Sequence, residues 1–163
     1  MTMMATATDV LEAVRAIPDP EIPVITIEGL GILRECRLDE AAGLVHVVIT
    51  PTYSGCPAMR AIEDQIARVC RAHGLRAVVT SQLSPAWTTD WISAEAKEKL
   101  RQYGIAPPVK SASDDPFAEP PAVPCPRCGS EHTTLRSQFG ATGCKALYVC
   151  EDCREPFEYF KHF

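Results

Sequence analysis

The sequence has no long hydrophobic run. No stretch approaches the roughly 18 uncharged apolar residues of a membrane-spanning helix, so we expect no membrane association. The N-terminal segment has neither a basic region nor an extended apolar stretch, which argues against a secretory signal peptide. We therefore expect a soluble cytoplasmic protein, in a compartment where thiols stay reduced.

The sequence also has no excess of basic residues. It has 16 lysines and arginines against 21 aspartates and glutamates, a net charge of −5. Nucleic-acid-binding surfaces are normally basic because they displace counterions from phosphates. Residues 123–163 hold five residues of each sign and are neutral, which favours contact with protein over contact with nucleic acid.

Two signatures of redox enzymes are missing. The chain contains no dinucleotide-binding fingerprint, so it is not predicted to be a reductase. It also has no Glu-x-x-His pair of the kind that di-iron bundles use. We expect no catalytic activity from the chain alone.

The hydrophobic periodicity predicts an α+β domain followed by a linker and a small C-terminal domain. The first domain, residues 1–106, is expected to be a small sheet covered by helices. Its expected helices are 8–17, 56–74 and 93–104, and its expected strands are 32–38, 44–49 and 75–83. Residues 107–122 are rich in proline, serine and acid, which predicts a flexible linker.

The strongest motif is a pair of Cys-x-x-Cys knuckles in residues 123–163. Cys125 and Cys128 form the first knuckle, and Cys150 and Cys153 form the second. Four thiolates suit a tetrahedral metal site, and a reducing compartment disfavours disulfides between them. Zinc is the default ion, although iron or an iron–sulfur cluster also accepts four thiolates. We expect a zinc ribbon that owes much of its stability to the metal.

The ribbon's hairpin is predicted from residues 133–139 and 144–149. An extended strand would place Cys144 about 20 Å from the second knuckle, too far to be a ligand. Cys144 is then either an exposed accessory thiol at the hairpin tip or a buried apolar side chain. The tail aromatics form either a contact surface for a partner or the core of the ribbon: Phe157, Tyr159, Phe160 and Phe163.

The segment 51–58 is the most suggestive part of the larger domain. Cys56 lies between a predicted strand and a predicted helix, at the expected helix cap. The helix dipole favours a thiolate there, which could be a nucleophile or could transiently hold iron or an iron–sulfur cluster. Thr50 and Thr52 can donate hydrogen bonds to such a site. The alternative is a helix cap that happens to be cysteine.

Several segments resemble the MIP18 family, also called the DUF59 domain, whose members act in iron–sulfur cluster assembly. They are Asp19-Pro-Glu-Ile-Pro, the Leu30-Gly31 turn, residues 50–57 and Pro85-Ala-Trp, in the family's order. The resemblance implies an iron–sulfur cluster assembly-like fold. By resemblance, Cys56 corresponds to the family's reactive cysteine and Asp19 to its acidic position.

The ribbon adds a second resemblance. Residues 125–130, 139–146 and 155–161 are similar to the D subunits (PaaD-type, also called PaaJ) of the phenylacetyl-CoA 1,2-epoxidase system. That resemblance implies an accessory protein that matures a metal centre in an oxygenase or reductase component during aerobic phenylacetate breakdown.

Three hypotheses follow. The chain matures an iron or iron–sulfur centre in a partner, or it is a structural oxygenase subunit that docks the reductase, or it is an interaction module with a structural zinc. Its expected partners are the other epoxidase subunits, and the sequence leaves a homodimer open.

Overall fold

The computed structural model describes residues 6–110 and 117–163. The chain forms two compact units, Met1–Ser93 and Ala94–Phe163. No helix in the described ranges combines the length and the apolar character needed to cross a membrane.

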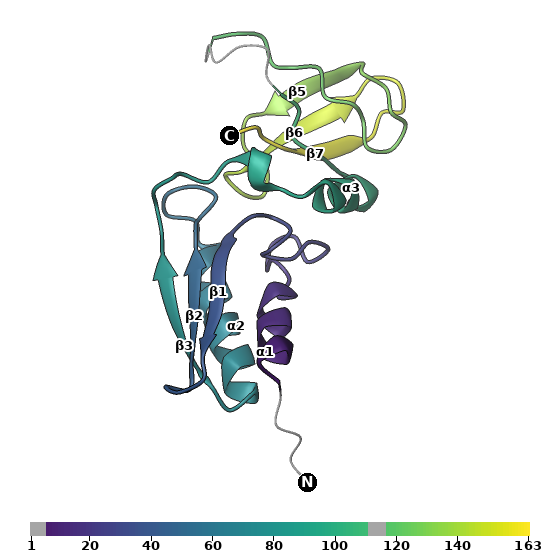
Figure 1. Cartoon of the computed structure of the whole chain (residues 1–163). Coiled ribbons are helices and arrows are strands. Elements are labelled where there is room, and N and C mark those ends of the chain that lie inside the picture. Colours follow the sequence, from purple (N-terminus) through teal and green to yellow (C-terminus); the bar gives the residue numbers. More distant parts are fainter. Residues whose placement is uncertain (1–5, 111–116) are drawn as a thin grey trace. The chain divides into compact units, whose positions relative to one another are not determined.

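The first unit is a three-stranded sheet with helices. Its elements are α1 (Ala7–Arg15), β1 (Leu33–Asp39), β2 (Leu44–Ile49), α2 (Ala58–Ala72), β3 (Arg76–Ser81) and a short 3-10 helix (Thr89–Trp91). The strand order is β1-β2-β3, with β2 antiparallel to β1 and parallel to β3 (Figure 1). The expected strand pair and the helix that follows it are confirmed.

Alternation along β2 decides which face of this sheet is buried. Val45, Val47 and Ile49 are almost fully buried, whereas the residues between them are half-buried. Helix α1 contacts β1, and α2 contacts β3. Ile62 and Ile66, one turn apart on α2, contribute to this core, as the 3.6-residue period requires.

The Leu30-Gly31 turn is held by the two tryptophans. The indole N–H of Trp87 donates to the carbonyl oxygen of Leu30 at 3.0 Å. Gly31 has φ +80°, and a Cβ there would lie 2.7 Å from the Cβ of Trp91. Only glycine fits both the backbone conformation and the space.

The second unit contains the ribbon. Its elements are α3 (Ala94–Tyr103), β4 (Ile105–Ala106), β5 (Thr133–Ser137), β6 (Lys145–Cys150) and β7 (Pro156–Phe160). The strand order is β4-β7-β6-β5 (Figure 1). The predicted hairpin corresponds to β5 and β6, and the C-terminal aromatics form an additional strand, β7.

The division between the units differs from the predicted boundary after residue 106. Strand β4 pairs in parallel with β7, and Ala106 lies in the core of the ribbon. Helix α3 contacts β4, so it belongs with the second unit. The backbone N–H of Val109 donates to the hydroxyl of Tyr159 at 3.2 Å, so the start of the predicted linker lies against the ribbon. Residues 111–116 of that linker lie outside the described residues.

Candidate metal centre

The cysteines of the two knuckles converge in the second unit. Their four Sγ atoms lie within 4.8 Å of one another. The Cys125 and Cys153 sulfurs are 3.8 Å apart, and the Cys128 and Cys150 sulfurs are 3.5 Å apart. Four sulfurs at about 2.3 Å from one zinc ion form a tetrahedron with edges of about 3.8 Å, whereas a disulfide is about 2 Å long. The geometry fits one shared metal ion.

The two knuckles have the same backbone conformation. The N–H of Gly129 donates to the carbonyl oxygen of Cys125, and the N–H of Arg154 donates to that of Cys150, both at 2.9 Å. In each knuckle the N–H of the first cysteine also donates to the carbonyl oxygen five residues later, at 2.9 and 3.0 Å. Gly129 and Arg154 both have positive φ, +77° and +66°. The local fold thus presents two matching pairs of thiols.

Contacts between the thiols affect their ionisation. The backbone N–H of Cys153, 3.5 Å from the Cys150 sulfur, lowers the pKa of Cys150 to about 7. The N–H of Glu155 lowers the pKa of Cys153, but burial and the hydrogen bond with Cys150 outweigh it and raise that pKa to about 12. Neighbouring thiolates repel one another, so a cation is needed for all four to ionise together. Metal binding at this site therefore releases protons.

A polar cluster outside the thiols joins the two knuckles. The hydroxyl of Ser130 donates to the carboxylate of Asp152 and accepts a hydrogen bond from the N–H of His132 at 3.0 Å. Nδ1 of His132 lies 3.2 Å from Oδ2 of Asp152. These contacts link the segment that follows the first knuckle to Asp152 in the second knuckle. Sequence reasoning missed them, because only the folded ribbon brings Asp152 next to residues 20 or more positions earlier.

The ribbon core behind the knuckles is small. Its buried members are Ala106, Val123, Cys125, Ala146, Tyr148, Cys150, Phe157 and Tyr159. The rings of Tyr148 and Phe157 stack at 5.9 Å, and those of Tyr148 and Tyr159 meet edge to face at 5.5 Å. The prediction that the tail aromatics form the ribbon core is confirmed for Phe157 and Tyr159. Phe160 is buried outside this cluster, and Phe163 is 42% exposed.

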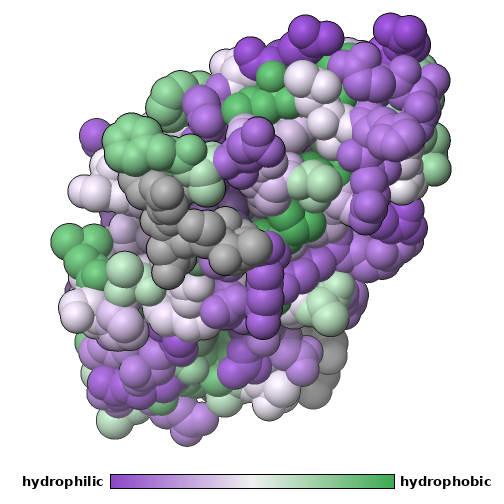
Figure 2. Space-filling view, turned by 90° about the horizontal axis from the view of Figure 1, so that it is seen from above, coloured by the Kyte–Doolittle hydropathy of each residue, from purple (hydrophilic) through white to green (hydrophobic). Residues whose placement is uncertain are grey.

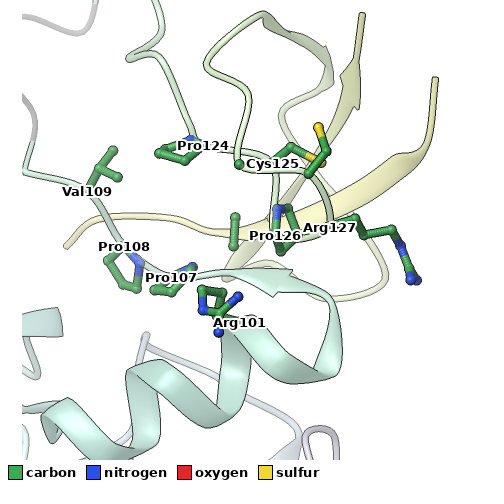
Figure 3. Close-up of a pocket in the computed structure, with 11 residues that line it drawn as sticks. Arg101, Pro107, Pro108, Val109, Pro124, Cys125, Pro126 and Arg127 are labelled. Atoms are coloured by element: carbon green, nitrogen blue, oxygen red, sulfur yellow. The ribbon is translucent and has the colours of Figure 1, made fainter. Parts of the chain in front are cut away.

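An open groove of about 570 Å³ lies beside the first knuckle. Figure 3 shows Pro107, Pro108 and Val109 along one wall and the segment from Pro124 to Arg127 along the other. Cys125 and Cys128 also line the groove. The lining is largely apolar. A solute in the groove would therefore contact the protein beside the metal-binding thiols.

In the first unit, Cys56 lies in the loop between β2 and α2. Pro57 is the cap residue of α2, so Cys56 lies one residue before the cap. This assignment is one residue later than the predicted cap, although Pro57 has the φ and ψ of a first helical residue, −68° and −21°. Cys56 is half-buried and lines a shallow concavity with Met59 and Glu63. Its thiol thus lies at the surface, next to the N-terminus of α2.

The other predicted members of this site are buried. Thr50 directly follows β2, and its hydroxyl has no hydrogen-bond partner within residues 6–110 and 117–163. Thr52 is also buried. The carboxylate of Asp19 closes its own turn, because Oδ1 accepts from the N–H of Glu21 at 2.9 Å and from that of Ile22 at 2.8 Å. These residues shape the loops, whereas Cys56 is the accessible group.

Of the two alternatives for Cys144, the buried apolar side chain is confirmed and the exposed thiol at the hairpin tip is wrong. Cys144 is only 5% exposed, and its sulfur lies 3.1 Å from the hydroxyl of Thr142. The ammonium of the next residue, Lys145, pairs with Glu158 at 3.1 Å. Cys144 and Cys150 lie at opposite ends of β6, as predicted.

Comparisons with known families match both parts of the chain. Residues 7–80 match the family model of an iron–sulfur cluster assembly protein. Residues 109–161 match the model of the PaaD zinc β-ribbon domain. Between them these models cover α1 to β3 and all four knuckle cysteines.

Two curated relatives match this chain over different lengths. A protein of Escherichia coli (strain K12), provisionally named as the D subunit of 1,2-phenylacetyl-CoA epoxidase, is 52% identical over 89% of this chain and 86% of its own. An "Fe-S protein maturation auxiliary factor" of Porphyromonas gingivalis (strain ATCC BAA-308 / W83) is 33% identical over 60% of this chain and 92% of its own.

A solved structure supports the fold of the first unit. The crystal structure of a DUF59 domain from Bacillus anthracis covers 58% of this chain and 90% of its own, with a TM-score of 0.51 and 24% identity. On the evidence of the Escherichia coli relative, this chain belongs to the family of phenylacetyl-CoA epoxidase D subunits, in which an iron–sulfur cluster assembly domain precedes a PaaD zinc β ribbon.

Proposed function

We propose that this protein is an accessory factor that helps to assemble an iron or iron–sulfur centre in a partner component of a phenylacetyl-CoA epoxidase. The names of the two curated relatives support the two halves of this proposal, the epoxidase and the maturation of iron–sulfur proteins. The chain's match to an iron–sulfur cluster assembly family supports the second half independently.

The observation that carries the proposal is the placement of Cys56. Burial raises the pKa of Cys70 to about 11 and also raises the pKa of Cys36, so both remain thiols at neutral pH. Cys56 lines an open concavity beside the N-terminus of α2, where a metal cargo can reach its sulfur. A thiol that takes up and releases a metal cargo needs such access.

In this proposal Cys56 holds the cargo and the ribbon has a separate task. The cargo passes on by ligand exchange, in which a thiolate of the partner replaces the thiolate of Cys56 and no electron is transferred. Thr50 and Thr52 shape the loop that carries Cys56, and Asp19 rigidifies a second loop of the same unit. The four-cysteine centre holds a zinc ion whose ligands are all protein thiolates, a coordination typical of structural sites.

The order of addition tests the proposal. Epoxidase components are produced without this protein, and the full chain is added either during anaerobic loading with iron and sulfide or only afterwards. A maturation factor is required during loading and dispensable later. If activity requires the chain in every turnover assay of fully loaded components, the chain is a structural oxygenase subunit and the proposal is wrong.

Cys56→Ser tests the cargo thiol in the same reconstitution. We expect at least a tenfold loss of loading, with the zinc content unchanged. Cys36→Ser is the matched control, because Cys36 is also half-buried but lies within β1. Full loading by the Cys56→Ser protein would exclude Cys56 as the cargo ligand.

A further inference from the structure

The turn between β5 and β6, residues 138–143, is held in place by a side chain from β7. We call it the tip turn. Oε2 of Glu158 accepts a hydrogen bond from the N–H of Ala141 at 3.3 Å and lies 3.1 Å from Nζ of Lys145. Lys145 is only 4% exposed, whereas the side chain of Glu158 is 30% exposed, so the ammonium is the buried member of this ion pair. Burying the ammonium of Lys145 without a partner would cost desolvation free energy, and the carboxylate of Glu158 offsets that cost.

Gly140 lets the tip turn approach this ion pair closely. Its N–H donates to the carbonyl oxygen of Lys145 at 2.7 Å. A Cβ at Gly140 would lie 2.8 Å from Oε2 of Glu158 and 3.4 Å from the carbonyl oxygen of Lys145. Any larger residue would displace the carboxylate that supports the turn. The shape of the tip turn is therefore set by packing.

This rigid turn presents an aromatic ring to solvent. Phe139 is 69% exposed, although both of its backbone polar groups are bound by the hydroxyl of Ser137, at 2.8 and 3.2 Å. Nζ of Lys161 lies 4.5 Å from the centre of the Phe139 ring and donates to the carbonyl oxygen of Gln138 at 3.0 Å. The ring is thus fixed on one side by a cation–π contact while its other side faces water.

Phe139 is one of six large apolar side chains that stay exposed in the described residues. Hydrophilic residues cover most of the face shown in Figure 2. Large apolar side chains that stay exposed in the described residues are Val78, Leu83, Tyr103, Phe117, Phe139 and Phe163. An exposed aromatic ring that is already restrained in the free protein loses less conformational entropy on binding. Aromatic residues are also enriched at protein interfaces.

We propose that Phe139 and Lys161 form a docking anchor for a folded protein partner. The partner would offer an apolar pocket that accepts the benzyl group, with carboxylates at its rim. The charge argues for acidic groups there, because Lys145 and Glu158 neutralise each other and Lys161 leaves the tip turn with one positive charge, in a chain of net charge −5. This inference rests on the proposed function, from which it takes the partner to be an epoxidase component.

Binding of the full-length, metal-loaded chain to each purified epoxidase component tests the anchor by calorimetry. We expect Phe139→Ala to weaken the complex by at least about tenfold, the usual effect of removing a hot spot. Phe117→Ala is the matched control, because Phe117 is 93% exposed, and it should bind like the wild type. Gly140→Ala keeps the ring but disturbs the turn, and it should also weaken binding.

The outcomes separate the anchor from the proposed function. Equal affinities of the wild type and Phe139→Ala would overturn the anchor and leave the maturation role standing. A wild type that binds no component would overturn both. Lys161→Gln should weaken binding and reduce its dependence on salt, since it removes the charge that faces the partner's carboxylates. An unchanged salt dependence would contradict the acidic rim.

Discussion

At the scale of single residues, one position distinguishes the two knuckles. Each knuckle places the residue after its second cysteine in the left-handed region, but the first uses Gly129 and the second uses Arg154. An L-residue pays about 1–2 kcal/mol for that conformation, which glycine avoids. The second knuckle therefore stores strain that the first does not.

We predict that Arg154→Gly stabilises the second unit by about 0.5–1 kcal/mol, because relief of the strain exceeds the chain entropy that glycine loses. The ion pair that is lost with Glu151 is long, 3.9 Å, and exposed, so its removal matters little. Urea unfolding of the metal-loaded chain measures the change.

The reverse substitution is the control. At Gly129 a Cβ would meet nothing within 4 Å, so Gly129→Ala changes only the backbone strain and should destabilise by a similar amount. If the two substitutions shift stability in the same direction, backbone strain does not govern the knuckles.

At the scale of elements, the pairing of β4 with β7 places β4 and the helix before it, α3, in the second unit. Strand β4 has only two residues, yet both are buried, and both pair with β7. The side chain of Ala106 belongs to the core of the ribbon. Helix α3 also belongs to the second unit, because only Gly104 separates it from β4.

Ala106→Asp tests this assignment. Ala106 is fully buried, so a carboxylate there should destabilise the second unit by several kcal/mol. Amide hydrogen exchange should then accelerate in β6 and β7 and stay unchanged in β2 and α2. The exposed substitution Lys110→Asp should leave both units protected. Acceleration confined to β2 and α2 would instead place residue 106 in the first domain, as the sequence pattern predicts.

At the scale of the whole molecule, the two units differ in what stabilises them. The first has a continuous core of aliphatic side chains from its sheet and helices. The second has a core of eight buried residues, two of which are cysteines of the metal centre. The two units should therefore respond differently to loss of metal.

We predict that a chelator unfolds residues 117–163 and leaves the first unit folded. Hydrogen exchange before and after chelation measures this directly, and elemental analysis of the released ion identifies the metal. Cys150→Ala should reproduce the effect without chelator, whereas Cys56→Ser should not. A ribbon that keeps its protection after complete metal loss would show that its small core suffices.

Patterns over a few neighbouring residues predicted much of this fold. The strand pair β1–β2, helix α2 and the knuckle spacing are all local features, and each appears in the structure. Helix α2 ends at Ala72, and Gly74 adopts a positive φ of +73° just beyond its end. Periodicity, turn residues and ligand spacing act between residues close in the chain, so they can be read without knowing the fold. For Cys144 these patterns left an exposed and a buried side chain as equal alternatives, because the choice between them depends on distant segments.

The sequence by itself therefore determined the two-part organisation, the elements of the first sheet and the thiol donor set. Only the tertiary structure decided that β4 and α3 belong with the ribbon, that Asp152 joins the knuckles and that Phe139 is held at the surface. Each of these depends on contacts between residues about 20 or more positions apart, such as Ala106 with Tyr159 and Phe139 with Lys161. Such contacts exist only after the strands have paired, and no local pattern encodes them.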